Sequence, residues 1–164
     1  MHRCSKRANA IAPNDTFVLT YLAAAHCNIG DYAVARHYIE KSIRLNPNHR
    51  FTLNIAAMVY AWLGETEASL AWLDRYMETA PLSLGVDFEV AFEVYYLAER
   101  YEDAIAATAG YAEISLNASV DIAAAYAQAG HLKKAAELRR SFEANKPMGH
   151  SFEAHAEAIL RLCA

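Results

Sequence analysis

The 164-residue sequence predicts an all-α protein, a stack of about four helix pairs with additional helices at its ends. Three observations support this prediction. Pro13, Pro47 and Pro81 are each 34 residues apart, and so are Gly30 and Gly64. Between these markers, apolar residues recur at the spacing of amphipathic helices. Because glycine favours the turn between helices and proline ends a helix, two independent markers indicate one repeating unit.

Each repeat also has small residues and large apolar residues at fixed places. In the first repeat these are Leu19, Leu22, Ala23, Ala35 and Ile39, and in the second Leu53, Ala56, Ala57, Ser69 and Leu73. This pattern and its period resemble the tetratricopeptide repeat (TPR). The resemblance implies a right-handed α–α superhelix that binds other proteins and has no catalysis of its own. The third repeat departs from the pattern, because Glu99 replaces the glycine and Leu116 replaces the proline.

Taken in order, the chain divides into six segments. We expect a half repeat or N-terminal cap helix in residues 1–14 and a C-terminal capping helix in residues 148–164. Four repeats lie between them, in residues 15–48, 49–82, 83–115 and 116–147. Their helices are expected over residues 15–28, 32–45, 49–62, 66–79, 85–98, 101–113, 117–129 and 132–144. The incomplete ends indicate either a fragment of a longer protein or a chain closed by cap helices.

Local residues explain several of these helix boundaries. Asp15 and Asp31 suit the N-cap position, where a short carboxylate accepts hydrogen bonds from the first turn, and Thr66 is expected to cap its helix in the same way. Residues 145–149, Asn-Lys-Pro-Met-Gly, interrupt the helical pattern. We expect Ser151 to cap a last helix, whose apolar face could cover the end of the stack.

Composition and charge exclude several classes of function. No apolar run reaches the length of a membrane span, and the N-terminus lacks the apolar segment of a secretory signal. The three cysteines are widely spaced, which predicts a reducing, cytoplasmic location. Residues 65–121 contain twelve Asp or Glu and two Lys or Arg, between mildly basic ends. Because nucleic acids require a continuous basic track, we expect a protein or peptide partner and no nucleic acid.

Within the resemblance, the first helix of each pair lines a concave face that holds an extended peptide or a partner helix. The residues expected on this face are Phe17, Thr20, Tyr21, Ala24, Asn28, Phe51, Asn54, Met58, Trp62, Glu89, Glu93, Tyr96, Val120, Asp121, Ala124 and Gln128. The Lys, Asn and Arg residues with which some TPR domains clamp a peptide carboxylate are absent from the equivalent positions. An aromatic stretch followed by carboxylates predicts an amphipathic helix with a basic flank as the partner.

Other functions stay open. The last helix, residues 151–163, is an alternative dimerisation surface, and Glu89 with Glu93 could serve as acid and base in a small helical enzyme. We expect no cofactor and no metal site. The fourth repeat resembles the repeat regions that follow bacterial class III nucleotide cyclase domains or winged-helix regulators. That resemblance implies the regulatory part of a larger signalling protein, such as an adenylate cyclase.

Overall fold

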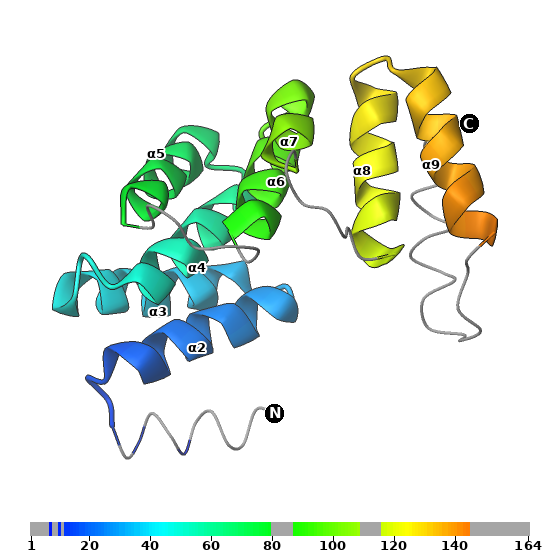
Figure 1. The fold of residues 1–164 in the computed structure, drawn as a ribbon. Coiled ribbons are helices and arrows are strands. Elements are labelled where there is room, and N and C mark those ends of the chain that lie inside the picture. Colours follow the sequence, from blue (N-terminus) through cyan, green and yellow to red (C-terminus); the bar gives the residue numbers. More distant parts are fainter. Residues whose placement is uncertain (1–6, 8–9, 11, 80–86, 109–115, 145–164) are drawn as a thin grey trace. The chain divides into compact units, whose positions relative to one another are not determined.

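The structure is a computed structural model that describes residues 7, 10, 12–79, 87–108 and 116–144. The described residues form eight helices (Figure 1). They are α2 (Thr16–Asn28), α3 (Tyr32–Leu45), α4 (Arg50–Trp62), α5 (Thr66–Glu78), α6 (Asp87–Leu97), α7 (Tyr101–Ala107), α8 (Leu116–Gln128) and α9 (Leu132–Ala144). Helices α2–α6 belong to one compact unit, residues 1–98, and α7–α9 to a second, residues 99–164.

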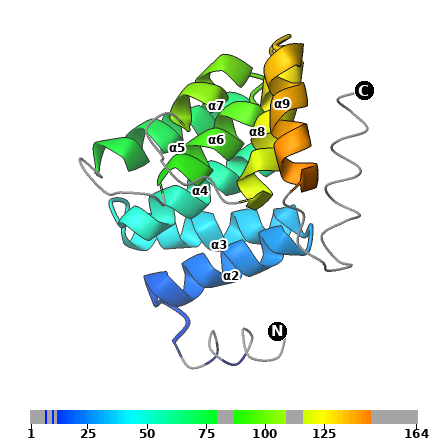
Figure 2. The ribbon, with the colours of Figure 1, turned by 45° about the vertical axis from the view of Figure 1, so that its right-hand side comes forward.

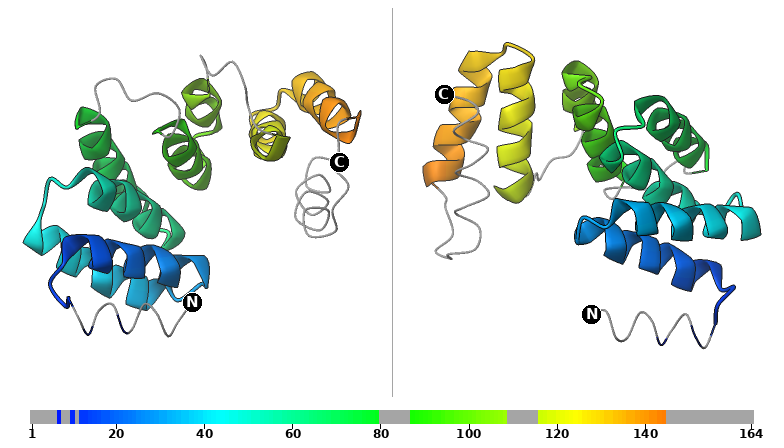
Figure 3. Two further views of the ribbon diagram at one scale, coloured as in Figure 1. Left: turned by 60° about the horizontal axis from the view of Figure 1, so that its bottom comes forward. Right: turned by 180° about the vertical axis from the view of Figure 1, so that it is seen from behind.

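In the first unit, each helix packs against the next helix, and the first helices of successive pairs also meet. Helix α2 contacts α3 and α4, and α4 contacts α5 and α6. Figure 2 shows α2 and α3 side by side with α4 next to them, and Figure 3 shows the same helices from two further directions. Helices α2, α4 and α6 are therefore direct neighbours along the stack, as stacked repeats require.

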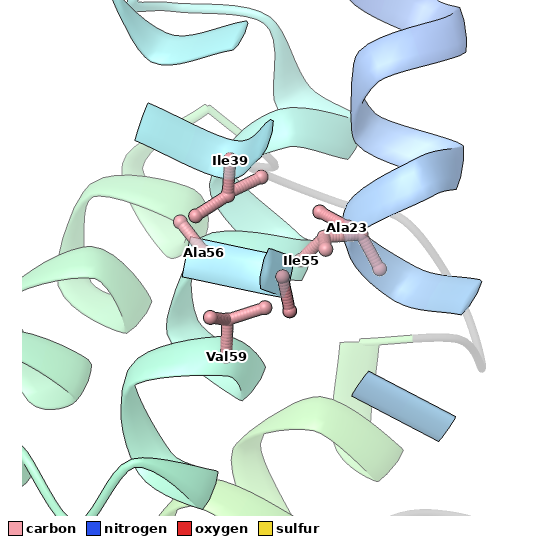
Figure 4. Packing of buried hydrophobic residues seen from close by; sticks show 6 residues of the cluster. Ala23, Ile39, Ile55, Ala56 and Val59 are labelled. Carbon is pink, nitrogen blue, oxygen red and sulfur yellow. The ribbon is translucent and has the colours of Figure 1, made fainter. Parts of the chain in front are cut away.

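Small residues let α2, α3 and α4 approach closely. Ala23, Ala35 and Ala56 come from these three helices and have no exposed surface. They form one buried cluster with the larger side chains of Ile39, Ile55 and Val59 (Figure 4). Because small and large residues alternate across the contact, the side chains of the three helices interdigitate.

A buried group of hydroxyls crosses the same three helices. The Thr20 hydroxyl on α2 lies 2.8 Å from Ser42 Oγ on α3 and 2.9 Å from Thr52 Oγ1 on α4. Ser42 Oγ also lies 3.1 Å from the Thr16 carbonyl oxygen, to which it can donate, and 3.2 Å from Thr52 Oγ1. Since a buried hydroxyl without a partner is costly, this network fixes the relative register of the helices.

The network corrects the prediction for Thr20. The sequence placed Thr20 on the concave face, but its side chain is 0% exposed. Thr20 is the fifth residue of α2, one position before Tyr21, and a step of roughly 100° around the helix turns it from the surface towards α3 and α4. Thr20 therefore stabilises the stack and cannot contact a partner.

The turns within pairs use a left-handed residue. Gly30, Gly64 and Gly130 have φ values of 78°, 74° and 84°, and Glu99 occupies the same kind of position with φ 58°. Residues other than glycine pay a conformational cost there. The backbone at Glu99, which stands where the other turns have glycine, is therefore locally strained.

Basic side chains tie the second helices to the preceding loops, again at the repeat period. Lys41 Nζ donates to the Pro13 carbonyl at 2.7 Å, and Arg75, 34 residues later, donates to the Pro47 carbonyl at 2.9 Å. Proline interrupts the helical hydrogen bonding at each of these places, and the basic side chain supplies a partner for its carbonyl.

The second unit has its own small core. Ala104 on α7, Ala123 and Ala125 on α8, and Ala135 and Phe142 on α9 are buried. On its surface, His131, the residue after Gly130, lies 2.8 Å from the Glu102 carboxylate on α7. In the first unit Glu65, the residue after Gly64, pairs with Arg36 on α3.

The structure confirms the all-α prediction and the antiparallel pairs of α2 with α3, α4 with α5 and α8 with α9. Helix α7 ends at Ala107, earlier than expected, because the Thr108 hydroxyl and its amide both donate to the Ile105 carbonyl. Asp15 caps α2 by accepting from the Val18 amide at 2.9 Å.

Two other expected caps differ from the prediction. Thr66 is the first residue of α5, and the N-cap position belongs to Glu65. Asp31 takes the N-cap position without a side-chain cap bond, and its carboxylate lies 3.2 Å from His26 Nδ1. The C-terminal capping helix and most of the expected half repeat lie outside the described residues.

The strain at the turn predicts opposite effects at two equivalent positions. A Cβ on Gly64 would meet no atom within 4 Å, so Gly64→Ala should destabilise the protein only through its φ, by about 1 kcal/mol. Glu99→Gly should relieve the strain and stabilise the protein by about 0.5–1 kcal/mol. This net value already subtracts the conformational entropy that glycine adds to the unfolded chain. Urea denaturation followed by circular dichroism measures both. Destabilisation by Glu99→Gly would contradict this account.

The hydroxyl network predicts unequal costs at two buried serines. Ser42 contacts three partners, whereas Ser69 Oγ makes one described bond, to the Ala57 carbonyl at 2.8 Å. Ser42→Ala should therefore cost about 2–3 kcal/mol and the control, Ser69→Ala, about 1 kcal/mol. Equal losses in the free energy of unfolding would show that the network adds nothing beyond a single hydrogen bond.

Candidate functional site

One face of the first helices carries equivalent residues 34 positions apart. On α2 these are Phe17, Tyr21, Ala24 and Asn28, and on α4 they are Phe51, Ile55, Met58 and Trp62. Within each helix the spacing of four, three and four residues keeps the side chains on one side. We call this set the α2–α4 stripe. It runs from the beginning of each helix to its end.

Aromatic rings cluster at the beginning of the stripe. The ring centroid of Phe17 lies 5.1 Å from Tyr21 and 5.4 Å from Phe51, and the Tyr21 and Phe51 centroids are 5.1 Å apart. Phe17 is 51% exposed and Tyr21 57% exposed. We call these three residues the aromatic cluster. It presents a large apolar surface to solvent, held in place by contacts between its rings.

A cavity of about 360 Å³ lies at the other end of the stripe. Helices α2, α4 and α6 and the turn before α3 line it, with Ala24, Cys27, Asn28, Gly30, Tyr32, Ile55, Met58, Val59, Trp62 and Glu93. Among the described residues the lining is mixed in character, because it combines apolar side chains with polar groups of Cys27, Asn28, Tyr32, Trp62 and Glu93. Such a cavity suits a group that has both apolar and polar parts.

Trp62 connects the helices around the cavity. Its Nε1–H donates to Glu93 Oε1 at 2.9 Å, which joins α4 to α6. Its ring is stacked on Tyr32 at the start of α3, with centroids 6.1 Å apart and planes inclined by 9°. Trp62 is nevertheless 43% exposed. The indole is therefore fixed in orientation and still accessible.

Cys27 is a poor candidate for chemistry in this cavity. Burial, and secondarily the negative charge of Glu93, raises the pKa of its thiol to about 11. The thiol therefore stays protonated at neutral pH, and a protonated thiol is neither a good nucleophile nor a metal ligand. Within the ranges that the structure describes, no group of three or more His, Cys, Asp or Glu side chains could hold a metal ion.

The predicted site residues separate into groups. Phe17, Tyr21 and Phe51 form the aromatic cluster, while Ala24, Asn28, Met58, Trp62 and Glu93 line the cavity. Asn54 is half-buried on α4, and Glu89 is exposed on α6. Tyr96 stacks on Phe92 with centroids 5.9 Å apart. Asp121, Ala124 and Gln128 belong to α8 in the second unit, where Ala124 is buried.

Tyr32 and Cys27 line the cavity, although neither is among the residues predicted for the site. The predicted concave face includes first helices alone, whereas Tyr32 begins the second helix of its pair. The signal that could have found it is its position two residues after Gly30, because the tight turn brings the start of α3 beside the end of α2. Cys27 adjoins Asn28 at that same helix end.

Comparisons with known proteins agree with this architecture. Residues 16–49 match the family described as tetratricopeptide repeat. The fold is similar to the crystal structure of TTC0263, a thermophilic TPR protein in Thermus thermophilus. That match has a TM-score of 0.74 and 18% sequence identity, and it covers 96% of this chain and 87% of that one.

A search of curated proteins found no match. None of the helices in the described part of the chain is long and apolar enough to cross a membrane. TPR modules are generally protein–protein interaction scaffolds, and residues 16–49 carry both the repeat match and much of the buried cluster of the first unit. Residues 16–49 therefore match a tetratricopeptide repeat, and the chain is similar in fold to a known TPR protein.

Proposed function

We propose that the α2–α4 stripe, together with α6, binds a peptide or helix of a partner protein. The observation that carries this proposal is the aromatic cluster. Two of its three rings are more than half exposed, although the chain has buried positions for large apolar residues elsewhere. Exposed aromatic residues that are gathered and held by one another are typical of binding surfaces.

The shape of the stripe favours an elongated partner. Eleven residues separate Phe17 from Asn28 on α2, and the same number separates Phe51 from Trp62 on α4. At a rise of about 1.5 Å per residue, the stripe is roughly 16 Å long. About three turns of a partner helix, or about five residues of extended peptide, match this length. Apolar residues of the partner would contact the aromatic cluster.

Charge on the same helices favours a basic flank in the partner. Helices α2 and α6 contain no Lys or Arg, and α4 contains only Arg50, at its first position. The Arg50 guanidinium lies over the Tyr76 ring, 5.1 Å from its centroid. Helix α6 contributes Asp87, Glu89 and Glu93. A basic segment of the partner would approach this side without repulsion and with a faster association rate.

Fewer observations support the alternative functions. A helical enzyme would use Glu89 and Glu93, but the Glu93 carboxylate accepts the Trp62 indole N–H and Glu89 is exposed. The dimerisation surface in residues 151–163 lies outside the described residues. The regulatory role in a bacterial signalling protein, such as a nucleotide cyclase, rests on the sequence of the fourth repeat alone and stays a prediction.

Peptide selection tests the proposed function. A displayed library of random peptides, each roughly 16 residues long to span the stripe with flanks, is selected against the full chain. The affinities of the selected peptides are measured by fluorescence anisotropy. The double variant Phe17→Ala/Tyr21→Ala should bind them at least about tenfold more weakly, because it removes two exposed apolar contacts.

Met77→Ala is the matched control, since Met77 is also an exposed apolar side chain but lies on α5, outside the stripe. Circular dichroism should show that both variants keep the helical content of the wild type. If selection yields no peptides, or if peptides bind the double variant and the wild type equally, the stripe is not the binding surface.

A further inference from the structure

We propose that the cavity beside Trp62 receives one basic side chain of the partner, stacked on the indole and paired with the Glu93 carboxylate. This inference rests on the proposed function and adds the chemistry of one contact. It also distinguishes the two ends of the stripe. The aromatic cluster would contact apolar residues, whereas the cavity would select a positive charge.

The cavity has the volume and the lining for such a group. It measures about 360 Å³, compared with the roughly 30 Å³ that a water molecule occupies in the liquid, so it has room for a side chain of several heavy atoms. Apolar side chains such as Ala24, Ile55 and Met58 would contact the methylene groups of the ligand. Glu93 and the faces of Tyr32 and Trp62 would contact its charged end.

Charge complementarity favours a cation over any other polar group. The described residues that line the cavity include a carboxylate and no Lys or Arg. The negative charge of Glu93 also acts on Cys27, another residue of the lining, where it adds to the effect of burial in raising the pKa of the thiol. A cation in this position would gain both from the carboxylate and from the electron-rich face of the indole.

The contact is also pre-organised. The hydrogen bond of 2.9 Å from Trp62 Nε1 to Glu93 Oε1 holds the carboxylate beside the ring, and Tyr32 holds the ring from one side. A carboxylate accepts several hydrogen bonds at once, so the indole and a guanidinium can share it. Arginine fits best, since its flat guanidinium both stacks on an aromatic ring and pairs with a carboxylate.

A small probe tests the cavity directly. The ¹⁵N-labelled full chain is titrated with N-acetyl-arginine amide and, as a neutral control of similar shape, N-acetyl-citrulline amide. The arginine probe should shift the Trp62 indole N–H resonance, and the citrulline probe should not. The Trp72 indole is an internal reference, because it already packs against Tyr60 and Arg75 and does not line the cavity.

Two matched variants distinguish binding in the cavity from a general attraction of the probe to negative charge on the protein. Glu93→Gln should abolish the shift caused by the arginine probe. Glu89→Gln, which removes the same charge from the exposed surface of the same helix, should preserve it. Equal shifts with arginine and citrulline, or equal losses in the two variants, would overturn the inference.

The selected peptides give a second readout. They should contain a basic residue whose replacement by citrulline weakens binding by about tenfold in the wild type and by less than about twofold in Glu93→Gln. Peptides that require the aromatic cluster but no basic residue would refute the cavity assignment and leave the proposed function intact. Peptides that ignore the aromatic cluster would refute the proposed function instead.

Discussion

The close approach of α2, α3 and α4 at Ala23, Ala35 and Ala56 determines most of what the first unit can do. These positions are fully buried, and any larger side chain would push the helices apart. The same contact brings Thr20, Ser42 and Thr52 within hydrogen-bond distance of one another. Apolar packing therefore sets the spacing of the helices, and the hydrogen bonds among the buried hydroxyls set their register.

Once the register is fixed, the opposite side of α2 and α4 follows from helix geometry. The buried residues Leu19, Ala23 and Ala56 face the core, so residues such as Phe17 and Met58 must lie towards the other side of their helices. The site is thus a by-product of stacking. Ile55 still belongs to the buried cluster, and Ala24, Phe51 and Met58 pack against it. The exposed members of the stripe, Phe17, Tyr21 and Trp62, are less constrained and can differ between the two repeats.

The two ends of the stripe differ for this reason. The 34-residue period places Asn28 and Trp62 at equivalent positions, yet only the tryptophan stacks on Tyr32 and donates to Glu93. In the same way Ala24, Met58 and Glu93 come from α2, α4 and α6 and supply small, apolar and charged parts of one cavity. The repeat provides equivalent places, and the individual side chains provide specificity.

The helices and turns could be predicted from the sequence because their determinants are local. Gly30, Gly64 and Gly130 stand where the left-handed conformation is needed, and helix lengths follow from the apolar period. The burial and contacts of individual side chains were harder to predict. A single step around the helix separates buried Thr20 from exposed Tyr21, and the period alone does not decide between them. The contact between Tyr32 and Trp62 depends on the path of the turn after Gly30, which the residue spacing in the sequence does not give.

The most direct measurement is the mapping of methyl and indole resonances on the full chain when a selected peptide is added. We expect the largest shifts at Ala24, Met58 and Trp62, which line the cavity on α2 and α4. Residues on α3 and α5 that lie away from this surface, such as Met77, should change little. Shifts concentrated on α3 and α5, with the Trp62 indole unmoved, would contradict a binding surface on the first helices.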